Sequence, residues 1–198
     1  MALPLRRLML AEFLGLPEEK PALEYQDGVI TRKMSPKGPH GRLEYGLGFL
    51  IGGFAEPRQL AAVFIETRVT FAGHSFVPDL ILYRWERIPR SPDGRVEDDF
   101  YEPPDLADEI ISPGQSIRDQ TERCHWYVDN AVPVALLINS RRETVTVFRT
   151  ELEPLLIRGD ELIDLEDILP GLQLTARRIF DALYFRQSGG SGTEEVAQ

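Results

Sequence analysis

Apolar residues follow two different periods along the chain, and these periods separate predicted helices from predicted strands. A spacing of three and four residues predicts amphipathic helices, whereas an alternating or continuous apolar run between turn residues predicts a strand. Ser116 and Asp119 form a start that resembles a capping box, which indicates that a helix begins there. The predicted helices are residues 5–16, 41–55, 116–129 and 176–185.

The strand pattern begins with an Asp27-Gly28 turn between two alternating segments, which predicts a β-hairpin over residues 23–34. A second hairpin is predicted around residues 140–142. Residues 84–104 are polar and rich in proline, as is typical of a long surface loop. The other predicted strands are residues 61–71, 77–83, 106–111, 134–139 and 144–149. Because helices lie between groups of strands, the predicted class is α/β with a mixed β-sheet.

The length and composition are those of one globular domain. We predict a single domain over residues 1–186 and a disordered tail over residues 187–198, whose sequence QSGGSGTEEVAQ has almost nothing to bury. The longest apolar runs, near residues 47–55 and 132–138, fall far short of the roughly 20 residues that a membrane span needs. The single cysteine, Cys124, cannot form an internal disulfide, which suits a reducing compartment. We therefore expect a cytoplasmic protein that has no membrane partner.

The charge and the missing motifs exclude several classes of function. The chain has 22 Lys and Arg against 32 Asp and Glu, a formal charge of −10, which argues against general attraction to nucleic acid but leaves room for a local basic patch. It contains no GxxxxGK[ST], HExxH, GxSxG or strand-linked GxGxxG motif. Its three histidines are too scattered for a histidine-rich zinc site. Any metal must then be held mainly by oxygen, which favours magnesium or manganese.

Asp79 is the most unusual polar residue, because it interrupts the apolar run VPDLILY. A buried carboxylate there needs a cation or hydrogen bonds as compensation. The segment LADEIISP carries Asp108 and Glu109, of which only one can face Asp79, since neighbouring strand residues point to opposite faces. Two carboxylates that meet this way repel unless they share a proton or a divalent ion. In the alternative reading Asp79 caps a strand end and Glu109 faces solvent.

Four segments in a fixed order carry a resemblance to a known family. YQDGVITRKMSPKGPH, VPDLILY, PPDLADEIISP and RDQTERCHWYVDNAVPVALLI are similar to the Uma-two family, which belongs to the PD-(D/E)XK nuclease superfamily. The similarity runs over about residues 8–185. It implies a restriction-endonuclease-like core in which helices flank a mixed β-sheet. It also implies a magnesium-dependent or manganese-dependent endonuclease that hydrolyses phosphodiester bonds in DNA.

The resemblance assigns roles to particular positions. Asp79 matches the first acidic metal ligand, Glu109 matches the second, and the backbone carbonyl of Ile110 is the candidate third ligand. His40 and Glu24 match a histidine and an acidic residue that recur in the family. His40 lies at the border of the apolar stripe of its predicted helix, so we expect it to face the sheet. The alternatives are a structural role for His40 and an exposed hairpin position for Glu24.

The chain departs from the family pattern at its lysine. The standard superfamily arrangement has lysine where this chain has Ile111. In the Uma-two family the lysine lies on the following helix, four residues after an aspartate, and counting from Asp119 that position is Arg123. Arginine can stabilise charge on a phosphate but cannot act as a proton acceptor. Alternatively, Arg123 only forms a surface pair with Asp119, or Lys33 or Lys37 supplies the missing lysine.

Three functions stay open at this point. The first is the DNA endonuclease, as a homodimer, with a phosphate-facing basic patch. The second is a weakened relative that binds nucleic acid or a protein without cutting, and the third is an interaction protein whose dimer surface is the selected feature. The candidate patch residues are Arg6, Arg7, Arg32, Lys33, Lys37 and Arg42.

Overall fold

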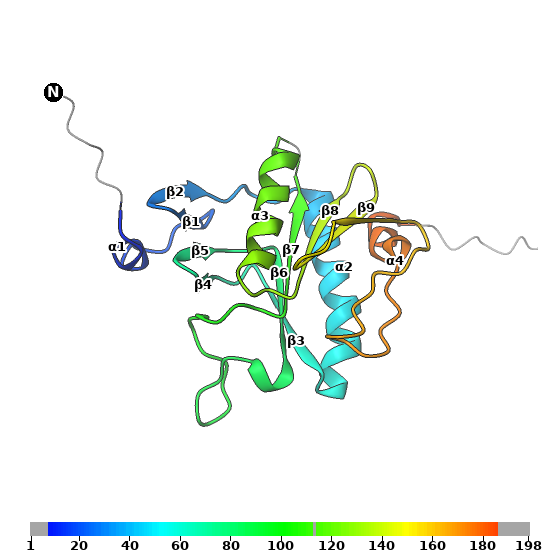
Figure 1. Ribbon diagram of the computed structural model, residues 1–198, viewed down its shortest axis with the longest axis horizontal. Coiled ribbons are helices and arrows are strands. Elements are labelled where there is room, and N and C mark those ends of the chain that lie inside the picture. The colour runs from blue at the N-terminus through cyan, green and yellow to red at the C-terminus, as the bar shows by residue number, and fades with distance from the viewer. Residues whose placement is uncertain (1–7, 113, 186–198) are drawn as a thin grey trace, which may run out of the picture.

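The computed structural model describes residues 8–112 and 114–185, so the predicted tail lies outside the described residues. Figure 1 shows a large sheet with helix α3 on one face and helix α2 on the other, and a smaller sheet beside it. The helices are α1 (Leu10–Leu14), α2 (Gly38–Ala55), α3 (Ile117–Asp129) and α4 (Ala176–Phe180), with 3-10 turns η1 (Glu56–Arg58), η2 (Trp85–Arg87) and η3 (Asp181–Leu183).

The large sheet has six strands in the order β10-β9-β8-β7-β6-β3. Only the β7–β8 pair is parallel among its neighbours, and α3 is the crossover that joins those two strands. The sheet is therefore mixed, as predicted. Its strands are β3 (Ala61–Ile65), β6 (Leu80–Arg84), β7 (Leu106–Ile111), β8 (Val134–Asn139), β9 (Thr144–Arg149) and β10 (Leu155–Arg158).

The small sheet was not predicted as a separate unit. Its order is β2-β1-β5-β4, and all its pairs are antiparallel. The predicted strand 61–71 is split, because Glu66 has a left-handed φ of 45° between β3 and β4. Ala72 and Gly73, with φ of 46° and 80°, then turn the chain into β5. The strands are β1 (Leu23–Gln26), β2 (Val29–Arg32), β4 (Val69–Phe71) and β5 (His74–Phe76).

The predicted helices agree with the structure in position but differ in length. Helix α2 begins three residues earlier than predicted, with Pro39 in its first turn, where a missing N–H costs nothing. Helix α3 begins as predicted, because the Ser116 hydroxyl accepts a hydrogen bond from the Asp119 N–H at 3.3 Å. The predicted helix 5–16 is present as the short α1, and its residues 5–7 lie outside the described part. The predicted helix 176–185 is α4 followed by η3.

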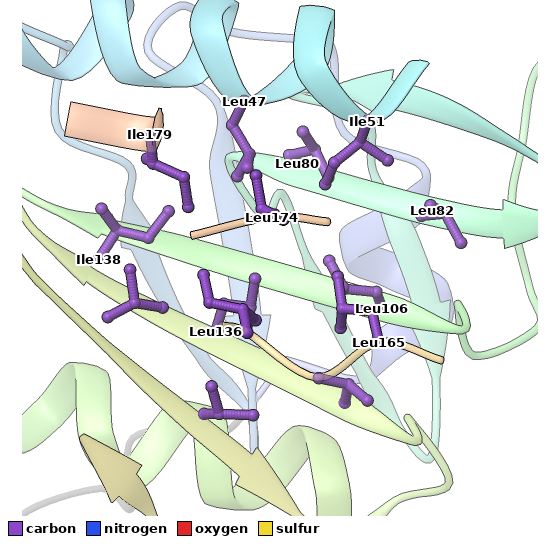
Figure 2. Packing of buried hydrophobic residues seen from close by; sticks show 14 of the residues in the cluster. Leu47, Ile51, Leu80, Leu82, Leu106, Leu136, Ile138, Leu165, Leu174 and Ile179 are labelled. Carbon is purple, nitrogen blue, oxygen red and sulfur yellow. The ribbon is translucent and has the colours of Figure 1, made fainter. Parts of the chain in front are cut away.

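Both faces of the large sheet are buried. Alternate residues of β6, such as Leu80 and Leu82, pack against Leu47 and other residues of α2, and Figure 2 shows this layer. The intervening residue Ile81 packs on the other face with Cys124 of α3, which is a core residue as expected. Burial on two faces explains why these strands read as continuous apolar runs. In the described part of the chain, no helix has the length and apolar character that crossing a membrane requires.

We expect Leu47→Ala to lower the free energy of unfolding by about 2–5 kcal/mol, because it leaves a cavity between α2 and the sheet. Leu47 is fully buried, whereas Leu152 is 63% exposed. Leu152→Ala is the control and should change stability by less than about 0.5 kcal/mol. Urea denaturation followed by circular dichroism measures both. Equal effects of the two substitutions would contradict this assignment of the core.

Candidate active site

The register of β6 against β7 brings Asp79 to Glu109. Leu80 pairs with Asp108, and the Asp79 N–H donates to the Asp108 carbonyl at 3.2 Å. One step further along this antiparallel register, Asp79 stands opposite Glu109. Asp79 Oδ2 also accepts a hydrogen bond of 2.6 Å from the Ile110 N–H. The side chain of Asp79 therefore meets β7 at the level of Glu109.

Glu109, rather than Asp108, is the acid that shares the site. Arg123 and Tyr127 of α3 contact Glu109 Oε1 at 3.4 and 2.7 Å. Asp108 follows the opposite alternation in β7 and is fully buried, with neither carboxylate oxygen hydrogen-bonded to a described side chain. Burial, followed by the charges of Asp79 and Glu109, raises the pKa of Asp108 well above its usual value, which favours the neutral carboxyl.

Asp79 is surrounded by positive and polar groups from distant parts of the chain. Its Oδ1 lies 2.6 Å from Lys33 Nζ and 3.3 Å from His40 Nε2. Burial alone would raise the pKa of Asp79, but the hydrogen bond from His40 and the charge of Lys33 outweigh it and lower the pKa. Asp79 is therefore ionised at neutral pH although it is only 2% exposed.

Lys33 is the site residue that the sequence named only as an alternative. It follows β2, where its N–H donates to the Ala22 carbonyl at 2.8 Å, and its Nζ donates to the Val77 carbonyl at 2.8 Å. Burial opposes its charge, but the charges of Asp79 and Glu109 prevail and raise the pKa of Lys33. Lys33 is therefore a permanent cation here. No spacing rule could have found it, because the hairpin and β6 are far apart in sequence.

His40 faces the sheet, as expected from its helical position. It lies in the first turn of α2 and is 5% exposed. Its Nδ1 lies 2.9 Å from Ser112 Oγ, and its Nε2 faces Asp79. Burial works against protonation of His40, but the hydrogen bond and charge of Asp79 raise its pKa above the usual value. His40 thus connects the start of α2 to the end of β7.

Arg123 pairs with two acids of the site and makes no surface pair with Asp119. Its guanidinium forms a bidentate contact with Glu24 at 2.9 and 2.8 Å, and it reaches Glu109 at 3.4 Å. Glu24 is 3% exposed, so it does not occupy an open hairpin face. Its Oε1 also accepts a hydrogen bond from the Val77 N–H at 2.9 Å. Arg123 therefore ties the hairpin to Glu109.

Burial and the charge of Asp79 raise the pKa of Glu109 to about 7, against the opposing charge of Arg123. Removal of the Glu109 carboxyl from water therefore opposes its ionisation even with Arg123 beside it. A divalent cation would lower this pKa and favour the ionised carboxylate.

The donor atoms fit a hard divalent cation. Within residues 8–112 and 114–185, no group of three or more His, Cys, Asp or Glu side chains is placed to hold a metal. A metal at Asp79 and Glu109 would then need main-chain or water oxygen as well. The N–H and carbonyl of one strand residue point to the same side, so the Ile110 carbonyl faces the side where its N–H meets Asp79. Two carboxylates and a carbonyl are oxygen ligands of the kind that Mg²⁺ prefers.

The site opens into a cleft of about 660 Å³ between the β1–β2 hairpin and α3. Lys33, Glu109 and Arg123 line this cleft, and the rings of Phe76 and Trp126 form part of its wall. The cleft is large enough to admit part of a polymeric substrate. Lys33, Glu109 and Arg123 face this cleft although each side chain stays mostly buried.

The residues of the predicted basic patch are divided between two cavities. Arg32 lines the same cleft as Lys33, and it pairs with Glu19. Lys37 and Arg42 line a different cavity, at the start of α2. Arg6 and Arg7 lie outside the described residues. The patch that the sequence predicted as one surface is therefore divided.

Glu44 is a site neighbour that the sequence analysis missed. It lies one helical turn after His40, is 8% exposed, and its Oε1 has no hydrogen-bond partner among the described residues. Burial, followed by the charges of Glu66 and Asp79, raises the pKa of Glu44 to about 7. Its spacing of four residues from His40, on the same helix face, was the signal that could have found it.

A mixed β-sheet flanked by helices, with two acids meeting on neighbouring strands, is the arrangement expected of a restriction-endonuclease-like fold. The Uma2 family, described as "Putative restriction endonuclease", matches residues 10–177, and the chain belongs to this family. The fold is similar to the crystal structure of a "putative nuclease belonging to DUF820" from Anabaena variabilis. That similarity has a TM-score of 0.85 and 33% sequence identity, and covers 89% of this chain and 99% of the other. No curated protein matches the chain.

We expect Glu44→Gln to flatten the pH dependence of stability. Between pH 4.5 and 7 the folded protein binds more protons at Glu44 than the unfolded chain, so this carboxyl makes the free energy of unfolding fall as pH rises. Glutamine stays neutral, so at pH 8 the variant should be more stable than the wild type by about 1 to 3 kcal/mol. At pH 4 the two should agree.

Urea denaturation from pH 4 to pH 8 measures this difference. Glu153→Gln, at an exposed position just before β10, is the control and should follow the wild type throughout. Parallel curves of the free energy of unfolding against pH for Glu44→Gln and the wild type would contradict this prediction. They would show that the Glu44 carboxyl is ionised in the folded protein as it is in the unfolded chain.

Proposed function

We propose that this member of the Uma2 family is a metal-dependent endonuclease that hydrolyses phosphodiester bonds in DNA. In this proposal Mg²⁺ (or Mn²⁺) is held by the carboxylates of Asp79 and Glu109 and by the carbonyl of Ile110. The observation that carries it is the meeting of these two buried acids beside Lys33, whose Nζ lies 2.6 Å from Asp79. The family and the similar nuclease structure support hydrolysis of nucleic acid in general.

Each side chain of the site has a distinct part in this proposal. A bound divalent cation supplies a Lewis acid that polarises the scissile phosphate and lowers the pKa of a water molecule. Lys33 takes the place of the missing lysine and contributes positive charge where charge builds up on phosphorus. Its raised pKa excludes proton acceptance by Lys33, so its contribution is electrostatic. His40 orients Asp79 by holding it from α2 through Nε2.

Arg123 is better suited to positioning than to direct contact with phosphate. Its guanidinium is already held by Glu24 in a bidentate contact, and its remaining contact goes to Glu109. Tyr127 donates to the same Glu109 oxygen at 2.7 Å. Together they fix the orientation of the Glu109 carboxylate, which a metal ligand requires. We therefore place Arg123 and Glu24 in the supporting layer of the site.

The alternative function, a protein that binds nucleic acid or a protein partner without cutting, rested on the missing lysine. Lys33 beside Asp79 removes much of that argument, although the net charge of −10 still favours a narrow rather than a general affinity for nucleic acid. The homodimer stays a prediction, and it would let two such sites cut two strands.

Supercoiled plasmid incubated with the protein and Mg²⁺ or Mn²⁺ tests the proposal. We expect nicking that EDTA abolishes, and a loss of at least about 100-fold in rate for Asp79→Asn and for Glu109→Gln. Asp98→Asn is the matched control, because that side chain is 93% exposed on the long loop, and it should keep full activity. Nicking by Asp79→Asn at the wild-type rate would refute the assigned site.

A second comparison of nicking rates separates the role of Lys33 from that of Arg123. Lys33→Gln should lower the nicking rate by about 100-fold, because it removes the charge beside the scissile phosphate. Lys20→Gln, an exposed lysine near the same hairpin, should have no effect. If Arg123→Lys instead activates an inert wild-type protein, the lysine function belongs to α3 and the role proposed for Lys33 is wrong.

A further inference from the structure

A second cavity lies next to the site, at the start of α2. It has a volume of about 430 Å³ and is bounded by the first turn of α2, the β8–β9 turn and η3. His40 lines this cavity, and its Nε2 lies 3.3 Å from Asp79 Oδ1. One histidine ring therefore separates the cavity from the acidic site.

This cavity is positively charged in a negatively charged protein. Lys37, Arg42 and Arg141 line it, against one acid, Glu143, which accepts a hydrogen bond from the Tyr184 hydroxyl. In four other cavities on the described surface, acids outnumber bases. With a net charge of −10 over the whole chain, the concentration of cations here marks a place for an anion.

The three cations are not neutralised by neighbouring acids. Lys37 and Arg141 make no ion pair with any residue in 8–112 or 114–185. Arg42 donates to the Ala182 carbonyl at 3.2 Å, which leaves its charge in place. The N–H of Arg141 donates to Asn139 Oδ1 at 3.1 Å and fixes the turn that presents this side chain.

Part of the cavity wall is apolar, which a phosphate alone does not explain. Ile111 and Leu183 line it, together with Pro39 and the ring of Tyr184. A volume near 430 Å³ is in the range of small-molecule pockets and suits one nucleotide. Bases inside a duplex are stacked and cannot enter such a concavity, whereas an unpaired base can leave its strand and lie against an aromatic ring.

We propose that this cavity binds one unpaired nucleotide of the substrate strand, next to the phosphodiester that is cut. Lys37, Arg42 and Arg141 hold its phosphate, and the apolar wall holds its base. The substrate class is then nucleic acid with an unpaired nucleotide beside the cleavage point, such as a single strand or an overhang. The inference rests on the proposed function only in taking nucleic acid as the substrate.

Binding without metal tests this inference separately from cleavage. Fluorescence anisotropy in EDTA compares a labelled single-stranded 12-mer with a blunt duplex of the same sequence. We expect the single strand to bind at least about tenfold more tightly. The double variant Lys37→Gln with Arg141→Gln should weaken this binding by about 10-fold to 100-fold. It should also reduce the slope of log affinity against log salt by about 1.4, since two phosphate-facing charges are lost.

The matched control removes the same charge elsewhere. Arg58 lies at the far end of α2 and Arg95 lies in the long loop, so Arg58→Gln with Arg95→Gln should change the affinity by less than about twofold. A filling variant, Ser140→Trp, keeps all three cations but occupies the cavity, and should reduce the preference for the single strand. Melting temperatures close to that of the wild type establish that each variant is folded.

Tight binding of the blunt duplex, or equal effects of the two charge variants, would overturn the inference even if the protein nicks plasmid. If, with Mg²⁺ or Mn²⁺, the protein cuts neither plasmid nor the labelled single strand but binds that strand through Lys37 and Arg141, the nucleotide site stands and the proposed cleavage fails. The two proposals can therefore fail independently.

Discussion

The site depends on neutralising carboxylates that the fold has taken out of water. Asp79 and Glu109 are 2% and 4% exposed, and each would be costly without a cation in reach. Lys33, which follows the hairpin, forms an ion pair with Asp79, and Arg123 of α3 forms one with Glu109. Both cations lie on elements outside the two central strands, so the small sheet and α3 must pack in place before the acids can be buried. The chemistry and the assembly of the fold are therefore linked.

The neighbouring cations compensate the two buried carboxylates unequally. The pKa of Asp79 is lowered by its cationic neighbours, whereas the pKa of Glu109 is raised to about 7 although Arg123 lies beside it. Two acids of one site with pKa values pushed apart are a common feature of catalytic centres. Burial is the largest cause of the raised pKa of Glu109, and an additional positive charge beside this carboxyl would lower its pKa.

His40 joins two regions of different chemistry. On one side it contacts Asp79 at the acidic site, and on the other it lines the basic cavity at the start of α2. Cleavage of a nucleic-acid strand needs both regions, because one phosphate must be held by positive charge while the neighbouring phosphate is hydrolysed. A net negative protein can then select a strand by local charge while it repels nucleic acid elsewhere.

Much of the fold could be read from the sequence, because local patterns decide local structure. Apolar runs between turn residues identified β7, β8 and β9, and the Ser116 cap located the start of α3. The Asp27-Gly28 turn also located the β1–β2 hairpin. Conversely, the β4–β5 half of the small sheet escaped detection, since it is made by a left-handed residue, Glu66, and an Ala-Gly turn that carry weak signals. The mostly exposed β10 was also missed, because its apolar pattern does not distinguish it from a loop.

The sequence by itself determined that Asp79 interrupts an apolar run and would need a partner if it were buried, because a buried carboxylate is costly. It left a strand-end cap as the alternative. It also placed Glu109, Arg123, His40 and Glu24 as candidates through resemblance. Only the tertiary structure decided between Asp108 and Glu109, since that choice depends on strand register. Only packing brought Lys33 to Asp79 and turned Arg123 toward Glu24. Contacts between residues distant in sequence follow from how whole elements pack, and no local pattern records that.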